Sequence, residues 1–434
     1  YMAYYIIETE EQLANLESSD QCFIDLVTKS DDCHPSLTIP SVIYYNNFDK
    51  GYVIIIDHSE GFSLPINKIQ DFLQGHKKVY LLNKKKHSYY LDLPNAIDVL
   101  YTVLETDGVI KDFSCDTIVH RDFTHKHKYV ASINTIIPIC KHYEKCECMF
   151  EIVKPYIGKE STQTLEWLSR YTEVYKWVEQ QGISINEKVF DKYYEPVWKS
   201  NSVRNGKIYT NYNLYNITAR PTNAFNGLNF LALNKDKSRT TFIPSNDFFA
   251  DFDFDGYHLR LVANMLNLVL PTDVSIHTLL GRDYFGKDEL TPEEYQESKK
   301  ITFRQMYNGV EDQYKHIELF KHIDEFVTEM WSQYQTGYIE LPNGRKLVQD
   351  NPNPQKLFNY YIQCLETVNN VKKLTKLKEY LQNKKSRVIL VVYDSILVDF
   401  SKEDGMATYE GIKAILEEDN YAVKVKIGDD YDFT

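Results

Sequence analysis

Hydrophobic positions in the first third of the chain fall into short runs separated by turn residues. Between residues 20 and 100 these runs are rich in β-branched and aromatic residues, and they read CFIDLV, SVIYYNN, YVIIID and VYLLN. The stretch NNFDKG (46–51) joins two of them in the manner of a hairpin. The pattern predicts a sheet-containing domain of about 130 residues.

The spacing of apolar positions becomes helical from about residue 136 to residue 191. This part contains TLEWLSRYTEVYKWVEQQG, and its final Gly182 is a typical helix stop. After it, NDFFADFDFDGYHLRLVANMLN (246–267) begins with the period of a strand and continues with that of a helix, which is expected over about residues 256–268.

Three aspartates of this strand, Asp251, Asp253 and Asp255, alternate with phenylalanines. Residues at positions i, i+2 and i+4 of a strand share one face, so the phenylalanines are expected to face a core. The carboxylates then crowd the opposite side, where like charges raise one another's pKa and cost stability. A chain that tolerates such crowding needs a reason for it.

The last third predicts four helices, a hairpin and a strand pair. SIHTLLGRDYFG is expected to be a short helix, and LTPEEYQESKKITFRQMYNG starts with the Thr, Pro and acidic residues of a helix N-terminus. A long helix follows, then a hairpin in GYIELPNGRKLV with its turn at Asn343-Gly344, and a helix over about residues 354–382. SRVILVVYDSILVDF predicts two strands around a turn at Tyr393-Asp394-Ser395.

Composition indicates a globular, non-membrane protein. The 434 residues are 43% hydrophobic and 26% charged, and no run of 18 apolar residues occurs. The first residues lack the features of a signal peptide, and the seven scattered cysteines are typical of reduced thiols, so a cytoplasmic location is expected. The net charge of −13 argues against a generally basic surface, although clusters of lysine leave room for a local basic groove.

Together with Asp394, far along the chain, the crowded carboxylates indicate a metal-binding function. One Asp at a strand end, a second in a β-turn-β unit and a Lys/Tyr helix between them could hold two divalent cations about 4 Å apart, the clamp used in nucleotidyl transfer. Mg²⁺ prefers carboxylate oxygens and substrate phosphates. Bound metal would neutralise the repulsion between the carboxylates.

At this point the chain resembles the family A DNA polymerases, from about residue 165 to its end. DFDGYHLRLVA resembles motif A with Asp253 as a metal ligand, and VVYDSI resembles motif C with Asp394 as the second. SKKITFRQMYNG is similar to motif B, and its Lys299, Phe303 and Tyr307 form one stripe on a helix.

Weaker matches occur in the same order along the chain. SIHTLLGRDYFG resembles a fingers segment that places His277 near the incoming triphosphate, and TARPTN resembles a segment that makes Arg220 a minor-groove contact. NYYIQ places Asn359 and Gln363 at the template–primer end, and GYIELPNGRKL resembles the palm hairpin, with Arg345 as a DNA contact.

The resemblance implies a multidomain α+β right-hand polymerase with palm, fingers and a reduced thumb, preceded by an RNase H-like α/β domain. The implied domains are a degenerate 3′–5′ exonuclease-like domain (1–135), a reduced thumb with connecting helices (136–205), the palm with motif A (206–260), the fingers with motif B (261–335) and the palm with motif C (336–434).

The implied function is template-directed extension of a primer with dNTPs in bacteriophage DNA replication. Catalysis is expected from Asp253, Asp394, Lys299 and Tyr307, with two Mg²⁺ ions for which Mn²⁺ can substitute. The expected partners are primer–template DNA, dNTPs and a processivity or replisome accessory protein in the host cytoplasm, with no membrane.

Several positions depart from the family pattern. His258 replaces the motif A glutamate that usually excludes ribonucleotides next to the motif B tyrosine, and Ser395 replaces the motif C acid, for which Asp255 is a candidate replacement. Tyr295 replaces a triphosphate-binding arginine, and its candidate substitutes are Arg282, Lys287, Lys300 and Arg304. The thumb segment is short, which implies weak processivity or an accessory partner.

The N-terminal domain lacks the acids of an exonuclease. Asp25 is present, but Val27 takes the place of the paired glutamate, and Asn83 with its following lysines stands where another acid is expected. We therefore expect a degenerate domain without proofreading.

Other interpretations remain open. Each site residue also has an ordinary structural explanation: a surface carboxylate, a turn residue, helix packing or a structural arginine. The cluster of His120, His125, His127, Cys140, His142, Cys146 and Cys148 is a zinc candidate without a CxxC pair. The alternative functions are a single-subunit RNA-polymerase-like enzyme, which the lost glutamate gate allows, and a catalytically silent nucleic-acid-binding replisome scaffold.

Overall fold

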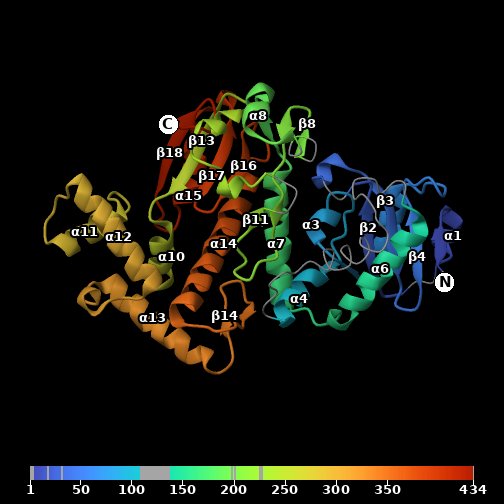
Figure 1. Cartoon of the computed structure of the whole chain (residues 1–434), viewed down its shortest axis with the longest axis horizontal. Helices are drawn as coiled ribbons and strands as arrows, with labels where there is room; N and C mark the ends of the chain where they lie inside the picture. The colour runs from blue at the N-terminus through green and yellow to red at the C-terminus, as the bar shows by residue number, and fades with distance from the viewer. Residues whose placement is uncertain are drawn as a thin grey trace. The chain divides into compact units, whose positions relative to one another are not determined.

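The computed structural model describes residues 4–16, 19–30, 33–107, 137–196, 199, 202–223 and 228–433 (Figure 1). The chain divides into two compact units. Unit 1 comprises residues 1–173, 196–204 and 224–228, and unit 2 comprises residues 174–195, 205–223 and 229–434. Each unit is described by itself below.

A six-stranded mixed sheet forms the centre of unit 1, in the order β1-β4-β3-β2-β5-β6. Its strands are β1 (Tyr5–Ile7), β2 (Gln21–Thr28), β3 (Pro40–Asn46), β4 (Gly51–Ile55), β5 (Lys78–Leu81) and β6 (Ala96–Asp98). The predicted hairpin is confirmed, because β3 and β4 pair antiparallel with Asn46 opposite Gly51. The parallel pairs β1/β4, β2/β5 and β5/β6 complete the sheet.

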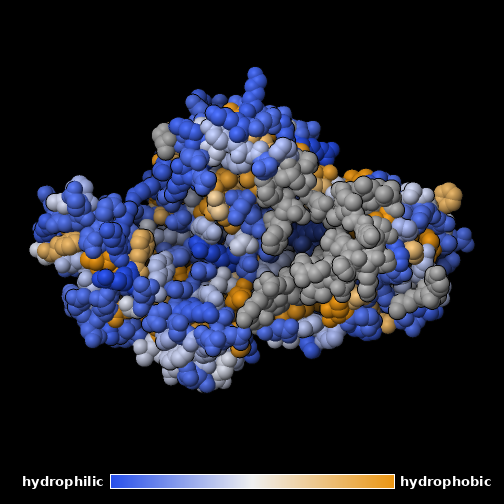
Figure 2. Space-filling view, in the orientation of Figure 1, coloured by the Kyte–Doolittle hydropathy of each residue, from blue (hydrophilic) through white to orange (hydrophobic). Residues whose placement is uncertain are grey.

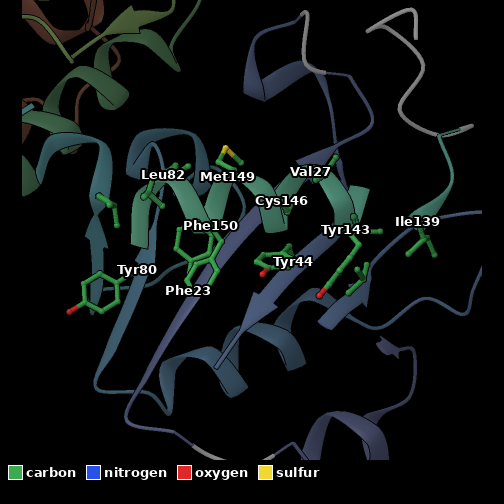
Figure 3. Packing of buried hydrophobic residues seen from close by; sticks show 14 of the residues in the cluster. Phe23, Val27, Tyr44, Tyr80, Leu82, Ile139, Tyr143, Cys146, Met149 and Phe150 are labelled. Atoms are coloured by element: carbon green, nitrogen blue, oxygen red, sulfur yellow. The ribbon is translucent and has the colours of Figure 1, made fainter. Parts of the chain in front are cut away.

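Helices cover both faces of this sheet. They are α1 (Glu10–Ala14), α2 (Ile66–Gln74), α3 (Lys84–His87), α4 (Val99–Asp107), α6 (Ile139–Val153) and the first part of α7 (Thr162–Glu179). Alternate residues of β2 point to opposite faces. The ring centroid of Phe23 lies 5.2 Å from that of Phe150 in α6 (Figure 3), whereas Ile24 joins a cluster with Leu73 of α2. Each face therefore has its own apolar core.

Unit 2 is built on a four-stranded antiparallel sheet in the order β16-β17-β13-β18. The strands are β13 (Phe248–Phe254), β16 (Arg387–Val392), β17 (Ser395–Phe400) and β18 (Val423–Gly428). Phe252 and Phe254 are buried, while Asp251 and Asp253 are only half-buried, so the expected alternation of core and carboxylate faces is confirmed. The turn between β16 and β17 also lies at the predicted residues.

The helices of unit 2 are the end of α7, α8 (Glu187–Tyr193), α10 (Tyr257–Met265), α11 (Ile276–Phe285), α12 (Pro292–Asn308), α13 (Glu318–Tyr334), α14 (Pro354–Tyr380) and α15 (Gly405–Glu417). The predicted start of α12 is confirmed as a capping box, in which the Thr291 hydroxyl accepts from the Glu294 N–H and the Glu294 carboxylate accepts from the Thr291 N–H. The long α14 contacts α10, α12, α13 and α15 and so organises this unit.

Short strands complete the structure: β7 (Ile183–Ile185), β8 (Val203–Arg204), β9 (Lys207–Ile208), β10 (Tyr212–Asn213), β11 (Thr222–Asn223), β12 (Phe242–Ile243), β14 (Ile339–Glu340) and β15 (Lys346–Leu347). The predicted hairpin is formed by β14 and β15, with Ile339 opposite Leu347. Hydrophilic residues dominate the face of the molecule seen in Figure 2, with hydrophobic residues in scattered groups. None of the helices in the described parts of the chain is long and apolar enough to cross a bilayer.

Candidate active site

Two carboxylates meet at one end of the unit 2 sheet. Asp253 lies near the end of β13, opposite Ser395 of β17, and Asp394 occupies the turn that leads into β17. The Phe254 N–H donates to the Asp394 carbonyl over 2.9 Å, which fixes the turn against β13. Tyr393 takes a positive φ of 56°, so the turn is sharp enough to place Asp394 beside Asp253. The sheet brings together two acids that are far apart in sequence.

The electrostatics of this pair suit a divalent cation. Burial, followed by the charges of Asp394 and Asp251, raises the pKa of Asp253 to about 6. Burial also raises the pKa of Asp394, and the charge of Glu366 adds to this, although a backbone hydrogen bond opposes it. Two half-buried carboxylates with raised pKa values are oxygen donors of the kind that Mg²⁺ prefers, so this pair could hold divalent metal.

Asp255 differs from these two acids because its charge is already neutralised. Lys424 of β18 donates to its carboxylate over 2.5 Å, and the guanidinium of buried Arg260 lies 3.7 Å from the same group. The Arg260 Nε also donates to the Asp255 carbonyl over 3.0 Å. Asp255 therefore has the contacts of an ion-paired structural acid, and the structure gives no support to it as the replacement for the motif C acid.

A pocket of about 520 Å³ opens over the two acids. One side is formed by α12, whose Lys299, Phe303 and Tyr307 all line it, as the spacing of these residues predicts. The rings of Phe303 and Tyr307 are nearly parallel, with centroids 6.1 Å apart. Since these rings line the pocket together with the ammonium-bearing Lys299, the pocket combines aromatic surface with positive charge.

His277 projects from α11 into the same pocket. Its ring meets Phe303 edge to face with centroids 5.4 Å apart. Burial, followed by the charge of Lys299, lowers the pKa of His277 to about 4, so the imidazole is neutral at neutral pH. Its Nδ1 is buried and has no hydrogen-bond partner.

A chain of hydrogen bonds runs along the wall of the pocket. The Tyr307 hydroxyl lies 2.6 Å from Nδ1 of His258, and Nε2 of His258 lies 2.5 Å from a carboxylate oxygen of Glu366. Arg220 donates to Glu366 through Nε over 2.9 Å, and its guanidinium stacks 3.8 Å from the ring centroid of Tyr393. Four side chains from separate parts of the sequence thus hold one another in fixed positions.

Most of the predicted site residues lie around this pocket. The lining includes Arg220, Asp253, His258, His277, Lys299, Phe303, Tyr307, Gln363 and Asp394. Asn359 lies one turn before Gln363 on α14 but is not among the lining residues. Arg345 is 1% exposed, and its three guanidinium nitrogens have no hydrogen-bond partner, so in this structure it is turned away from any surface that DNA could touch.

Two charged lining residues were missed by the sequence analysis, Glu366 and Lys424. Glu366 follows Gln363 by three positions and Asn359 by seven, so its helical spacing was a usable signal. Lys424 carried no such signal, because only the pairing of β18 with β13 places it opposite Asp253.

The four basic residues considered as substitutes for Tyr295 are not among the lining residues of the pocket. Lys287, Lys300 and Arg304 pair with Glu294, Glu297 and Glu311, and the Arg282 Nε donates to the Asp288 carbonyl. Among the described residues, the cations that line the pocket are Arg220, Lys299 and Lys424.

The zinc candidate falls only partly within the described structure. His120, His125 and His127 lie outside the described residues. Of the described members, Cys146 contacts Asp25 over 3.5 Å, and His142 packs edge to face against His58. In the described part of the chain, no group of three or more His, Cys, Asp or Glu residues is arranged to hold a metal ion.

Comparison with solved structures relates the fold of this chain to a polymerase domain. No protein-family model matches the chain, and no curated protein matches it. Among solved structures, it is similar to the POL domain of Pol1 from M. smegmatis, which was solved in complex with DNA primer-template and dNTP. The two share 12% sequence identity over 99% of each chain, with a TM-score of 0.73. The chain therefore has a mixed α/β fold that matches a DNA polymerase POL domain.

Proposed function

We propose that this protein is a template-directed DNA polymerase of the family A type, which extends a primer 3′-hydroxyl with dNTPs during phage DNA replication. The observation that carries the proposal is the pocket itself. It joins Asp253 and Asp394 to the Lys299, Phe303 and Tyr307 stripe of α12, within a fold that matches a POL domain over 99% of the chain.

The residues of the pocket have separable tasks in this reaction. Lys299 and Lys424 supply positive charge for the triphosphate of the incoming nucleotide, and His277 lines the same pocket as a neutral residue. Phe303 and Tyr307 present ring faces to the nascent base pair, where stacking and shape select the correct partner. His258 stands next to Tyr307 and fills the space that a ribose 2′-hydroxyl would need.

Asp253 and Asp394 would hold two Mg²⁺ ions, or Mn²⁺ in their place. Divalent cations bound there would lower the pKa of the primer 3′-hydroxyl and neutralise charge on the reacting phosphates. The carboxylates themselves are mounted on a paired strand and a hydrogen-bonded turn, so their separation is set before substrate binds.

Contacts with primer–template DNA are assigned to Arg220, Asn359 and Gln363, with Arg345 as a further candidate that would have to leave its buried position. A short thumb segment is the basis for expecting an accessory protein that supplies processivity. The proposed location is the cytoplasm of the host cell.

Unit 1 is proposed to be an exonuclease-like domain that has lost its hydrolytic activity. Asp25 is 8% exposed, and the thiol of Cys146 in α6 contacts its carboxylate over 3.5 Å. Val27, two residues later on the same face, belongs to the apolar cluster under α6. A helix packed on this face buries the one acid that is present, which supports loss of the activity.

A primer-extension assay tests the main proposal. The wild-type chain should extend a labelled primer with dNTPs and Mg²⁺, and Asp253→Ala or Asp394→Ala should reduce the rate by more than about a thousandfold while primer–template binding persists. Asp247→Ala removes an exposed acid next to the start of the same strand and serves as the matched control. Extension that survives either active-site change would contradict the metal assignment.

The same assay separates the alternatives. Equal use of rNTPs and dNTPs by the wild type would favour the RNA-polymerase-like function. Tight binding of primer–template without extension under any metal would favour a silent scaffold.

A further inference from the structure

Glu366 is a buried acid that has no direct role in the proposed nucleotidyl transfer. It lies on α14, is 1% exposed and touches neither of the assigned metal ligands through any hydrogen bond of the structure. Burial of a carboxylate is costly unless it is paired, and here Arg220 and His258 supply the pairing. Burying the Glu366 carboxylate costs free energy even when it is paired, which points to a role in organising its neighbours.

The contacts of Glu366 define the protonation of His258. Because Arg220 binds both oxygens of Glu366, at 2.9 and 3.4 Å, the group is a carboxylate and can only accept hydrogen bonds. The Nε2 of His258, 2.5 Å away, must then carry the proton.

The remaining nitrogen of His258 faces Tyr307. Burial, followed by the charge of Glu366, raises the pKa of Tyr307 to about 12, so its hydroxyl keeps its proton, and this hydroxyl lies 2.6 Å from Nδ1. The imidazole is thus held at both nitrogens, in one orientation, between α12 and α14.

We propose that Glu366 is a positioning residue for sugar selection: it locks His258 against Tyr307, so that the imidazole cannot move aside for a ribose 2′-hydroxyl. This inference rests on the proposed polymerase function and deepens it. Displacing the imidazole would break two hydrogen bonds and leave a buried carboxylate with one partner fewer, and this resistance is what discriminates against ribonucleotides.

The measured quantity is the ratio of kcat/KM for dATP to kcat/KM for ATP. Glu366→Ala frees Nε2 of His258, and we expect the ratio to fall by about 10-fold, within the range for loss of a steric contact. Glu366→Gln keeps an amide oxygen that accepts from Nε2 but loses the charge that pairs with Arg220, so it should keep a ratio within about twofold of wild type. A purely structural role would lower activity with both nucleotides and leave the ratio unchanged in either variant.

Arg220→Lys is the matched control, because it alters the other partner of Glu366 and leaves His258 in place. It weakens the Arg220–Glu366 pair and the stacking on Tyr393 while the His258 contact stays, so primer–template affinity should change and the sugar ratio should not.

A double-variant cycle gives a sharper test. His258→Glu alone would place two carboxylates within hydrogen-bond distance of each other in a buried site, and extension should fall by at least about 10-fold. Adding Glu366→Ala removes the repulsion and leaves the Tyr307 hydroxyl a carboxylate acceptor at position 258. Glu366→Ala should therefore impair selection in the wild type and restore extension with dATP in His258→Glu.

The outcomes distinguish this inference from the function on which it rests. A wild-type chain that extends no primer with dATP contradicts the polymerase proposal itself. A wild type that prefers dATP, combined with an unchanged ratio in Glu366→Ala, overturns the role of Glu366 alone. Failure of Glu366→Ala to rescue His258→Glu, in variants whose thermal melting matches that of wild type, also overturns it.

Discussion

Asp253, one of the two proposed metal ligands, destabilises the fold when it is charged and no metal is bound. Its pKa of about 6 in the folded chain exceeds that of an unfolded aspartate, near 3.9, because burial and Asp394 disfavour its charge. The folded chain therefore binds more protons than the unfolded chain between about pH 4 and pH 6. The contribution of Asp253 to the free energy of unfolding therefore decreases as pH rises through that window. Above about pH 6 its buried charge destabilises the fold to the full extent.

Asp253→Asn should consequently stabilise the metal-free protein while abolishing extension. A shift of about two pKa units corresponds to about 3 kcal/mol, and solvent screening at this half-buried site reduces the expected gain to about 1–2 kcal/mol. The melting temperature of the variant should exceed that of wild type at pH 8, and the difference should shrink toward pH 4. Mg²⁺ should raise the melting temperature of wild type more than that of Asp253→Asn, and the reverse order would contradict a metal site here.

Lys424 is the residue through which triphosphate binding can be tested. Lys424→Ala should raise KM for dNTPs by about 10- to 100-fold, the range for loss of one charge-assisted hydrogen bond, with little change in affinity for primer–template. Lys300→Ala, on the outward side of α12 and paired with Glu297, is the matched control.

An alternative role for Lys424, as a partner that only neutralises Asp255, makes a different prediction. Combining Lys424→Ala with Asp255→Asn removes both charges of the ion pair. If Lys424 binds triphosphate, the double variant keeps the high KM; recovery of the wild-type KM would show that the ion pair was its only task.

The junction between β13 and α10 is the element on which the geometry of the site depends most. Gly256 ends this junction with a φ of +57°, and a Cβ there would lie 2.2 Å from Cγ2 of Ile276, the first residue of α11. The close approach of these elements brings His258 and His277 into one pocket. Only glycine satisfies both the backbone conformation and the contact.

Gly256→Ala should therefore destabilise the fold by about 3 kcal/mol, from left-handed strain and overpacking together, and should lower extension because both histidines shift. Urea unfolding and primer extension measure the two effects. Adding Ile276→Ala relieves the contact but not the strain, so partial recovery is expected. Full activity in Gly256→Ala would show that the junction tolerates a side chain.

Elements with strong local signals could be predicted from the sequence, whereas contacts between distant elements could not. The Thr291 cap of α12, the turn at Asp394 and the alternation in β13 depend on residues a few positions apart, and each matches the structure. Glu366 and Lys424 acquire their roles only when α14 and β18 pack beside His258 and Asp255. The burial of Arg345 was likewise not predictable, because a local motif gives no information on burial.

At the scale of the whole molecule, the arrangement of elements is similar to that of a solved structure although the sequences are not. An identity of 12% with a TM-score of 0.73 over 99% of both chains means that most side chains differ while the fold is similar. Cores tolerate such replacement when volume and pattern are kept. Within this arrangement, a contact between distant elements holds His258 of α10 against Glu366 of α14, with Nε2 2.5 Å from the carboxylate.

Unit 1 is the part of the molecule whose activity the sequence predicts to be lost, and this can be tested in the full chain. A labelled primer with a mispaired 3′ end should stay intact with Mg²⁺ or Mn²⁺ in the absence of dNTPs, because Asp25 lies under α6 and Val27 takes the place of the second acid. Asp25→Ala should leave this result unchanged. Asp394→Ala, assayed in parallel, assigns any cleavage to unit 1 or unit 2. Metal-dependent shortening that Asp25→Ala abolishes and Asp394→Ala does not would establish unit 1 as an active exonuclease.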